Sequence, residues 1–541
     1  MPRFTYMPLF PASKERIPFR QLEGNFVSVR RERARTVLHV SPRALAALAE
    51  AAFHDVMFYF RRRHLEQLAA IVTDPQASDN DRFVARSLLE NAVIAAEGIL
   101  PACQDTGTAT IIAERGYNVS TRGDDAAWLS RGVRAAYTRY NFRPSQVAPL
   151  NMLEDVNTGN NLPAQIEIQA VPGNVYRFLF IAKGGGSANK TMFFQETRAI
   201  LADEQRLLEF LEEKIRTIGV AGCPPYHLAI VIGGTSPEMT LKTLKLATAD
   251  ALDTLTTRPS GRPHAYRDLD WEEKILTLSR KLGLGAQFGG RHFALDVRVI
   301  RMPHHAASLP IAIGVSCNAH RNILGKITPN GVFLEKLETN PQRLLDNLPA
   351  LKLPGAVPIN LDQPIDQIAA ELARLPLGTR LSLSGTLVVA RDAAHARLYR
   401  LLREGKPLPD YFLKHPVYYA GPARTPKGMA SGSFGPTTAQ RMDPYVAEFM
   451  KHGASRIMLG KGNRSPAVAE ACRRYNGFYL GAIGGSAALV ASRHIESSEV
   501  LDFHELGMEA VRKIRVRNLP AFLVGDNQGR TLYPSGSAVE V

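Results

Sequence analysis

A chain of 541 residues is too long for a single ordinary hydrophobic core, so its length predicts about two to four domains. Hydrophobic residues make up 45% of the chain and charged residues 22%, which is typical of a globular protein, and no stretch approaches the ~20 apolar residues of a membrane-spanning helix. The formal net charge of +15 favours anionic partners, which include nucleic acids, acidic membranes and small carboxylates or phosphates. Long basic runs are missing, so a nucleic-acid partner is the minority interpretation.

The chain has four cysteines, which are too few for a disulfide scaffold and indicate a reducing compartment. They are Cys103, Cys223, Cys317 and Cys472. Residues 1–10 lack the basic start, apolar core and small-residue cleavage site of a secretion signal. We therefore expect a cytoplasmic protein.

The first part of the chain is predicted to be largely helical. Ser41 and Pro42 form a favourable helix start, and residues 44–62 continue without a breaker. A second helix is predicted over residues 80–97, where Gly98 provides a left-handed stop.

Cys103 follows this helix on a loop, because Pro101 prevents the helix from continuing. Residues 103–108 place a soft metal ligand, an amide, a carboxylate and a flexible turn side by side. We interpret this stretch as one corner of a metal-cluster site. The competing interpretation is a buried unpaired cysteine that packs as a small hydrophobic residue.

Further along the chain, a helix is predicted over residues 124–140. Arg143 follows on a loop, because Pro144 restricts it to extended geometry. Two strands are then predicted over residues 165–169 and 175–182, separated by a turn.

The second of these strands leads into a glycine-rich loop, residues 183–191. The loop nearly spells a nucleotide-binding motif, but Asn189 stands where that motif needs glycine, so nucleotide binding is not expected. Three consecutive glycines between two lysines still expose backbone N–H groups that suit an oxygen-rich anion. The alternative is a tight turn without a ligand.

The next two cysteines also lie beside breaks in secondary structure. A helix is predicted from a cap at Asp203 to Ile218, and two prolines directly after Cys223 hold that cysteine in non-helical chain. A buried strand is expected over residues 227–232, and Cys317 lies beyond a further predicted strand.

Repeated prolines between residues 341 and 364 indicate a linker. This linker divides the chain into an N-terminal domain, residues 1–340, and a smaller C-terminal domain, residues 365–541. Both domains are predicted to have an α/β fold.

The C-terminal domain is predicted to present cations at strand ends. A strand over residues 381–390 leads to Arg391, a loop carries Arg441, and a strand over residues 457–459 leads to Lys461. Ligands bind at such strand ends, so convergence of the three cations on one ligand is weighed equally against solvated surface positions.

Together these residues resemble the class I, iron–sulfur fumarate hydratases. The matching segments keep their order over most of the chain and are residues 103–107, 183–191, 223–227, 285–290, 390–395, 419–423, 435–443 and 461–465. The resemblance implies a homodimer of two-domain α/β chains, each with an active site between its domains, and reversible hydration of fumarate to (S)-malate. It also implies a [4Fe-4S] cluster bound by Cys103, Cys223 and Cys317, with one iron left open as a Lewis acid.

The same resemblance implies roles for the polar residues. Asp105 would be the acid toward the leaving hydroxyl, and Thr437 the base at C3. Cys472, in a predicted helix, is assigned to packing. The substrate would be bound by Gln104, Arg143, the Gly186 backbone, His305, Arg391, Arg441 and Lys461.

Two positions depart from the pattern expected of the family. Gln440 stands where glycine is expected in the substrate loop, which leaves mesaconate and tartrate hydro-lyases as alternatives. His320 stands where an acidic residue is expected. Outside this class, a zinc hydrolase is disfavoured because the CxxC and HExxH motifs are missing, and a basic nucleic-acid-binding protein would show steep salt dependence.

Overall fold

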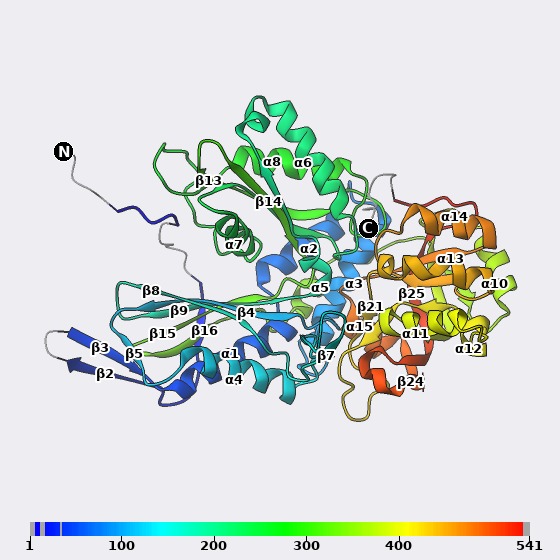
Figure 1. Cartoon of the computed structure of the whole chain (residues 1–541), viewed down its shortest axis with the longest axis horizontal. Coiled ribbons are helices and arrows are strands. Elements are labelled where there is room, and N and C mark those ends of the chain that lie inside the picture. Colours follow the sequence, from blue (N-terminus) through cyan, green and yellow to red (C-terminus); the bar gives the residue numbers. More distant parts are fainter. Residues whose placement is uncertain (1–5, 11–16, 33–34, 534–541) are drawn as a thin grey trace.

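The computed structural model describes residues 6–10, 17–32 and 35–533, which form a mixed α/β structure around three larger sheets (Figure 1). Two of the sheets belong to the first part of the chain and the third to the last part. This confirms the predicted α/β class with an N-terminal and a C-terminal region.

The first sheet has six strands in the order β1-β16-β15-β9-β4-β8. Helices α1 (Pro42–Phe58) and α4 (Asp125–Arg139) pack on it around a buried aromatic core. Strand β4 lies between β8 and β9, so the two strands predicted on either side of a turn are not neighbours. The strands are β1 (Phe19–Gln21), β16 (Gly331–Glu335), β15 (Asn322–Thr328), β9 (Tyr176–Lys183), β4 (Thr108–Gly116) and β8 (Gln165–Val171).

The second sheet has five strands in the order β10-β14-β11-β13-β12. Every residue of its central strand β11 is buried, because α7 packs on one face and α6 and α8 lie on the other; this explains the continuous apolar run in the sequence. The elements are β10 (Met192–Glu196), β14 (Leu309–Ser316), β11 (Tyr226–Gly234), β13 (Ala294–His304), β12 (Tyr266–Arg267), α6 (Glu204–Ile218), α7 (Pro237–Ala247) and α8 (Leu269–Lys281).

The third sheet, in the C-terminal part, is partly closed. Its order is β17-β18-β19-β22-β23-β25-β24, and β25 also pairs with β18, so five strands form a ring. The strands are β17 (Val357–Asn360), β18 (Arg380–Val389), β19 (Val417–Tyr418), β22 (Ile457–Gly460), β23 (Phe478–Ala482), β25 (Val511–Gly525) and β24 (Ile495–Asp502). The helices of this part are α10 (Ile365–Leu372), α11 (Asp392–Arg403), α12 (Asp410–Lys414), α13 (Asp443–Lys451), α14 (Pro466–Tyr475) and α15 (Ala487–Arg493).

Shorter elements complete the described chain. They are β2 (Val27–Glu32), β3 (Arg35–Val40), β5 (Val119–Thr121), β6 (Val147–Pro149), β7 (Asp155–Asn157), α5 (Gly185–Ala188), η1 (Arg198–Leu201), α9 (Gln342–Asp346), β20 (Ala420–Pro422), β21 (Phe434–Pro436), η2 (Ala439–Met442) and η3 (His504–Glu509).

The N-terminal helices differ in one respect from the sequence prediction. The helix predicted over residues 44–62 ends at Phe58, and α2 (Arg62–Thr73) starts in a new direction. Phe60 forms an isolated bridge with Glu338 between the two helices, and this tertiary pairing overrides the local helix propensity. Helix α3 (Asp79–Ala95) matches its prediction, with a capping box at its start and Gly98 in the left-handed region at its end.

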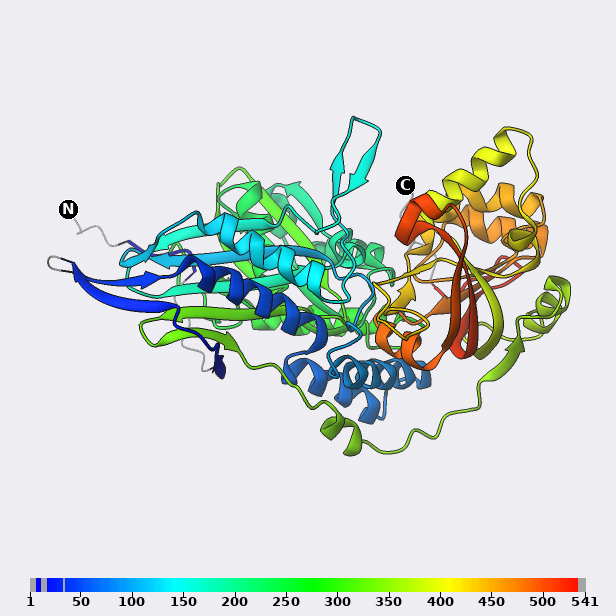
Figure 2. The same cartoon turned by 90° about the horizontal axis from the view of Figure 1, so that it is seen from below.

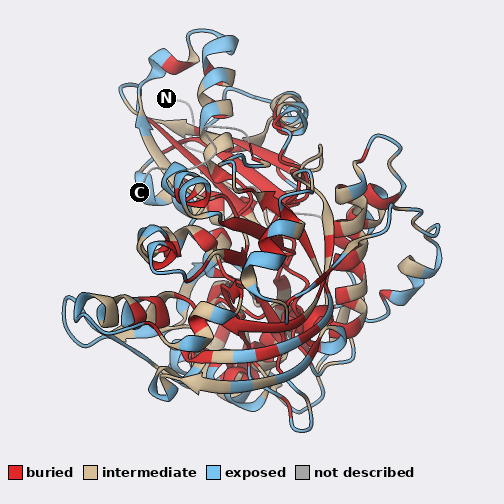
Figure 3. Cartoon of the chain, turned by 90° about the vertical axis from the view of Figure 1, so that its right-hand side faces the viewer, coloured by how far each residue is buried: buried red, intermediate tan, exposed pale blue. Residues whose placement is uncertain are grey.

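The two parts of the chain share one hydrophobic core. It runs from Phe60 to Tyr533, and the backbone N–H of Leu489 in α15 donates to the side chain of Asn91 in α3. Buried residues therefore continue through the middle of the molecule, while exposed residues lie on the outer helices (Figure 3).

A long connection joins the two parts along one side of the molecule (Figure 2). Strand β17 lies within residues 341–364, the stretch whose prolines predict a linker, and it pairs in parallel with β18. The C-terminal sheet therefore begins inside that stretch. The division at residues 341–364 stays a prediction.

Candidate active site

The ends of the two N-terminal sheets bring three cysteine loops together. In the first sheet, the start of β4 and the end of β9 are paired through Thr108 and Lys183. In the second, the start of β11 and the end of β14 are paired through His227 and Ser316. The loop before β4 carries Cys103, the loop before β11 carries Cys223, and Cys317 directly follows β14. Cys317 lies close enough to Cys103 and Cys223 to contribute to the raised pKa of both thiols.

Two cations lie beside these thiols. The Lys461 ammonium donates to the Cys223 sulfur at 2.8 Å, and Arg321 lies close to Cys103 and Cys317. Burial raises the pKa of Cys223 to about 11 and also raises that of Cys103, although Lys461 and Arg321 act in the opposite direction. Three soft donors, one buried and two partly buried, with cations beside them, fit a thiolate-bound iron–sulfur cluster.

The backbone around Cys223 is built for close packing. Cys223 itself has a left-handed φ of 65°, and a Cβ on Gly484 would collide with its sulfur. The side chains of Gln287 and Asn318 both donate to the carbonyls of Pro224 and Gly484. The C-terminal loop around Gly484 is thereby fixed against the cysteine.

Asp105 is held in its ionised form. Its carboxylate accepts from the Gly185 N–H at 2.8 Å and lies 3.6 Å from the Arg143 guanidinium. Burial alone would raise the pKa of Asp105, but Arg143 and Arg321 outweigh it and hold the pKa below its ordinary value. Gly184 must be small here, because a Cβ would lie 3.0 Å from the Asp105 carboxylate.

Arg143 is positioned through its backbone. The Thr106 hydroxyl donates to the Arg143 carbonyl at 2.7 Å and accepts from its N–H at 3.1 Å. The Tyr137 hydroxyl donates to the carbonyls of Thr106 and Gly107. Tyr137, near the end of α4, therefore fixes the backbone of Thr106, and Thr106 in turn fixes the backbone of Arg143.

From the C-terminal part, Arg391 caps the start of α11 and is almost completely buried. Its guanidinium donates to the Met508 carbonyl at 3.3 Å and lies 3.4 Å from Glu509. Burial, with the nearby charge of Arg143 as the next cause, lowers the pKa of Arg391 to about 10. Arg391 and Arg143 thus belong to one electrostatic group, although they come from opposite parts of the chain.

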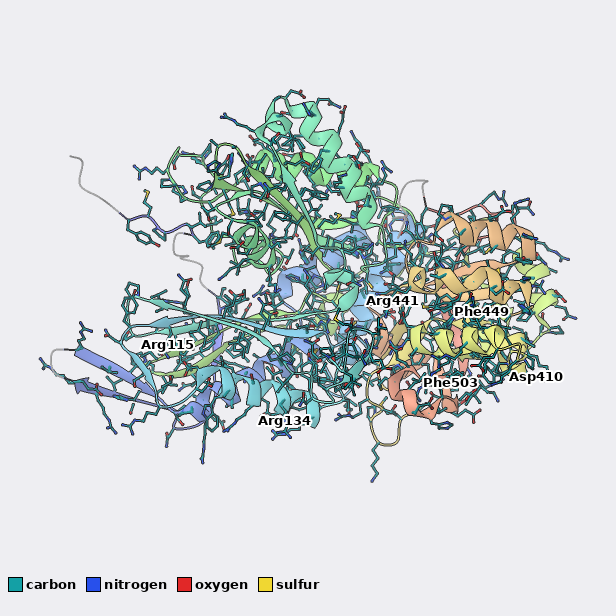
Figure 4. All side chains as sticks on the ribbon, viewed as in Figure 1. Arg115, Arg134, Asp410, Arg441, Phe449 and Phe503 are labelled. Carbon is teal, nitrogen blue, oxygen red and sulfur yellow. The ribbon has the colours of Figure 1, made fainter. Side chains whose placement is uncertain are left out.

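Arg441 lies where the two parts of the chain meet (Figure 4). Its side chain is 49% exposed and pairs with Asp392 at 2.8 Å. Arg441 is therefore more exposed than Arg391, and its role in binding substrate stays a prediction.

Three further predicted residues surround Lys461. Gln104 is buried and donates to the Pro436 carbonyl at 3.1 Å, next to Thr437. The Lys461 N–H donates to the Thr437 carbonyl at 3.3 Å. A Cβ on Gly186 would lie 3.2 Å from the Lys461 ammonium. The glycine-rich loop therefore faces the cation that contacts Cys223, in the first turn of α5.

Comparisons with known proteins identify the family of this chain. The family profile described as fumarate hydratase (Fumerase) matches residues 46–326, and the fumarase C-terminus profile matches residues 331–536. The anaerobic class I fumarate hydratase of Escherichia coli is 51% identical over 533 residues, covering 98% of this chain and 97% of its own. Fumarate hydratase 2 of Leishmania major is 52% identical over 500 residues, covering 92% and 88%.

The chain belongs to the class I fumarate hydratase family, whose enzymes are hydro-lyases. A putative L(+)-tartrate dehydratase subunit of Methanocaldococcus jannaschii is more distant, at 29% identity over 47% of this chain and 87% of its own. Among the described residues, no helix is long and apolar enough to cross a membrane.

Two residues considered in the sequence analysis, His305 and Cys472, lie away from the site of this fumarate hydratase family member. His305 follows β13, which runs parallel to β11, so it lies at the end of the sheet opposite Cys223. It is exposed and its ring accepts from the Ala307 N–H. Within one chain, His305 therefore does not reach the other site residues. Cys472 is buried in α14, as its assignment to packing predicts.

The sequence analysis missed Arg321, a buried guanidinium between the thiols and Asp105. One amino group lies within contact distance of where a Cβ on Gly184 would be. Its Nε is shielded from water and has no hydrogen-bond partner in the described chain. Its only sequence signal is its place four residues after Cys317.

A buried histidine network behind the cysteine loops was also missed. His227 hydrogen-bonds to Asp296 at 2.7 Å and to His64 at 2.9 Å, and His64 donates in turn to the Asn318 carbonyl. His320, noted as a departure, contacts Asp250 at 2.7 Å.

Ring and carboxylate atoms of His227, Asp250 and His320 lie within 4.8 Å of one another, as metal ligands would. Two observations speak against a metal ion here. Both ring nitrogens of His227 and of His320 already have protein partners. The guanidiniums of Arg61 and Arg298 each lie 3.0 Å from Asp250, so a cation would meet two positive charges.

Proposed function

We propose that this chain catalyses the reversible hydration of fumarate to (S)-malate, with a [4Fe-4S] cluster bound by Cys103, Cys223 and Cys317. The observation that carries the proposal is the convergence of three cysteine loops with Asp105 and with cations from both parts of the chain. When bound, the cluster would supply an iron without a protein ligand as a Lewis acid toward the substrate's hydroxyl and adjacent carboxylate.

The chain's own cations bind the dicarboxylate. Arg143, Arg391 and Lys461 approach the site from separate loops, and guanidinium groups match carboxylates in geometry as well as in charge. Arg441, whose side chain is partly exposed, contributes a further cation at the outer edge of the site. The Gln104 amide and the Gly186 N–H supply neutral donors that orient the substrate; His305, whose role is implied by family resemblance, is not used in this scheme.

Asp105 moves the proton at the hydroxyl. Because it is ionised in the free site, it is ready to accept a proton from the attacking water in the hydration direction. In dehydration the protonated form returns that proton to the leaving hydroxyl. A bound dianion reduces the net positive charge around Asp105, which raises its pKa toward the range that this cycle needs.

Thr437 is proposed as the group that moves the proton at C3. It lies between Pro436, whose carbonyl Gln104 holds, and the backbone contact with Lys461. The neighbouring cations favour an alkoxide, which an isolated threonine would not form.

Mesaconate and tartrate remain substrates to be compared with fumarate, because Gln440 lies in the substrate loop. The similarity to the tartrate relative is lower and covers less of this chain than that to the fumarate hydratases. A homodimer and a cytoplasmic location complete the proposal.

The cysteine series tests the proposal. Anaerobically purified protein should be brown, hold about four irons per chain and hydrate fumarate. Replacing Cys103, Cys223 or Cys317 by Ser should remove colour, iron and activity together, whereas the matched control Cys472→Ser should keep all three. Iron retained in one of the first variants, or lost only from the last, would overturn the ligand assignment.

A further inference from the structure

A cavity of about 270 Å³ lies outside the proposed active site, between the two parts of the chain. One wall is the segment around Phe142 and Arg143 that follows α4. The other walls are the segment from Pro422 to Thr425 and the start of β25 with Met508. Its volume is slightly below the range of roughly 300–1,000 Å³ for ligand pockets, which suits a small metabolite.

Three arginines line this cavity: Arg143, Arg424 and Arg512. Among the described residues, no carboxylate lines it, and neither Arg424 nor Arg512 forms an ion pair. Arg424 donates to the backbone carbonyls of Thr138 and Tyr140, which fix its position without neutralising it. The cavity therefore carries an uncompensated positive charge.

Of the three arginines, Arg512 gives the strongest argument that an anion binds in this cavity. Its Nε is shielded from water, yet no described residue accepts a hydrogen bond from it. Burial lowers the pKa of Arg512, and no nearby carboxylate is available to raise it again. Leaving a buried donor unpaired is unfavourable, and a bound ion is one of the explanations for such a group.

The cavity also adjoins the proposed active site. Arg143 lines it and lies 3.6 Å from Asp105. Met508 lines it too, and the Met508 carbonyl accepts from Arg391. An anion in the cavity would therefore be next to two of the arginines that we propose hold the substrate carboxylates.

We infer that this cavity is an outer carboxylate site, in which Arg512 and Arg424 receive a small dicarboxylate before it passes to Arg143 and Arg391. The inference rests on the proposed function for the identity of the dicarboxylate. Unpaired cations at the mouth of a cleft raise the local concentration of an anionic substrate and its association rate, and this effect is screened by salt.

The test compares Arg512→Gln with the wild type in the iron-loaded enzyme under anaerobic conditions. At about 10 mM ionic strength, where the Debye length is about 30 Å, Arg512→Gln should lower kcat/KM for fumarate about five- to tenfold through KM, with kcat unchanged. At about 1 M salt the two enzymes should agree within about twofold. Arg512→Lys, which keeps the charge, should retain most of the wild-type kcat/KM.

Arg515→Gln is the matched control. Arg515 lies on the same strand β25 but is exposed and pairs with Asp362 and Glu496, so its loss should leave the salt dependence unchanged. The inference is overturned if Arg512→Gln equals the wild type at low ionic strength, or if Arg512→Lys loses as much as Arg512→Gln. Should Arg512→Gln not fold, Arg424→Gln provides the same comparison.

Calorimetric binding of succinate, an unreactive dicarboxylate, separates failure of this inference from failure of the proposed function. Succinate should bind more weakly to Arg512→Gln than to wild type at low ionic strength, and equal affinities would overturn the inference. An enzyme that does not hydrate fumarate but still shows this difference would refute the proposed function and keep the outer site.

Discussion

Two regions of this protein bury many charges, and they treat them in opposite ways. In the network behind the cysteine loops, each buried guanidinium faces carboxylates: Arg61 contacts Glu335 and Asp250, and Arg298 contacts Asp253 and Asp296. In the proposed active site, Arg143 and Arg391 lie near one another, and each has a single carboxylate, at 3.6 and 3.4 Å. The Nε atoms of Arg391 and of Arg512 in the adjoining cavity lack partners in the described chain. The second region therefore keeps N–H groups that an anion can bind.

The hydrogen bonds show how complete the network is. His64 must donate from Nε2, because the Asn318 carbonyl only accepts. Burial lowers the pKa of His64 well below its ordinary value, so the ring is neutral and accepts at Nδ1. His227 therefore donates to His64 from Nε2, and its Nδ1 faces the Asp296 carboxylate. Both ring nitrogens of His227 thus have partners within the network.

Removing a cation from the proposed active site should have the largest effect, and this effect should be on activity. Arg391→Met should lower kcat/KM for fumarate by roughly 10²–10⁴-fold, the consequence of losing a desolvated partner of the substrate carboxylate. Because its surroundings disfavour the charge, the same change should leave the melting temperature unchanged or raise it. Arg397→Met, on the exposed side of α11, is the control and should change neither quantity. A large fall in melting temperature with Arg391→Met would contradict the comparison.

Removing a carboxylate from the histidine network should instead lower stability and leave activity nearly unchanged. Asp296→Ala leaves His227 and Arg298 without the buried carboxylate that both contact, and it should cost about 3–5 kcal/mol of stability. Thermal unfolding measures this loss, and kcat per folded, iron-loaded molecule should stay near the wild-type value. Glu470→Ala removes an exposed pair with Arg473 and should be nearly neutral. If Asp296→Ala abolished turnover without loss of stability, the network would belong to the reaction.

Lowering the pH should also destabilise the network, by a smaller amount than Asp296→Ala. Burial lowers the pKa of His320 to about 4, although Asp250 opposes this, so between pH 6.5 and 4 the unfolded chain binds more protons than the folded one. The free energy of unfolding is therefore unaffected by the titration of His320 above about pH 6.5. It falls by on the order of 3 kcal/mol as the pH is lowered from there to below about 4. Melting temperatures of the wild type and His320→Gln between pH 7 and 5 check this. Parallel curves for the two proteins would show that His320 does not contribute.

Much of the active site was visible in the sequence because its signals are local. Prolines and glycines beside Cys103 and Cys223 place each cysteine on a loop, and a helix stop at Gly98 is a property of adjacent residues. The resemblance supplied what local signals do not, namely which loops meet.

The rest could not be predicted because it depends on contacts between distant segments. His64, His227 and Asp296 are ordinary residues in a helix and two strands, and nothing near them in the sequence indicates that they meet. The break between α1 and α2 depends on Glu338, far along the chain. Arg512 reads as one basic residue of an alternating strand, and its missing partner is apparent only in three dimensions.

The ring of strands in the C-terminal part also fixes an order of events during synthesis. Strand β25 ends the described fold, and it is the strand that joins β18 to β23. At about 5–20 residues per second, roughly 10–40 s separate the translation of Cys317 from that of Val511. All three proposed cluster ligands are therefore made well before the loop around Gly484 can be fixed against Cys223. Under the proposed function, this interval would leave the cysteine loops of the nascent N-terminal part open to the factors that deliver iron and sulfur, and completion of the last strand would end it.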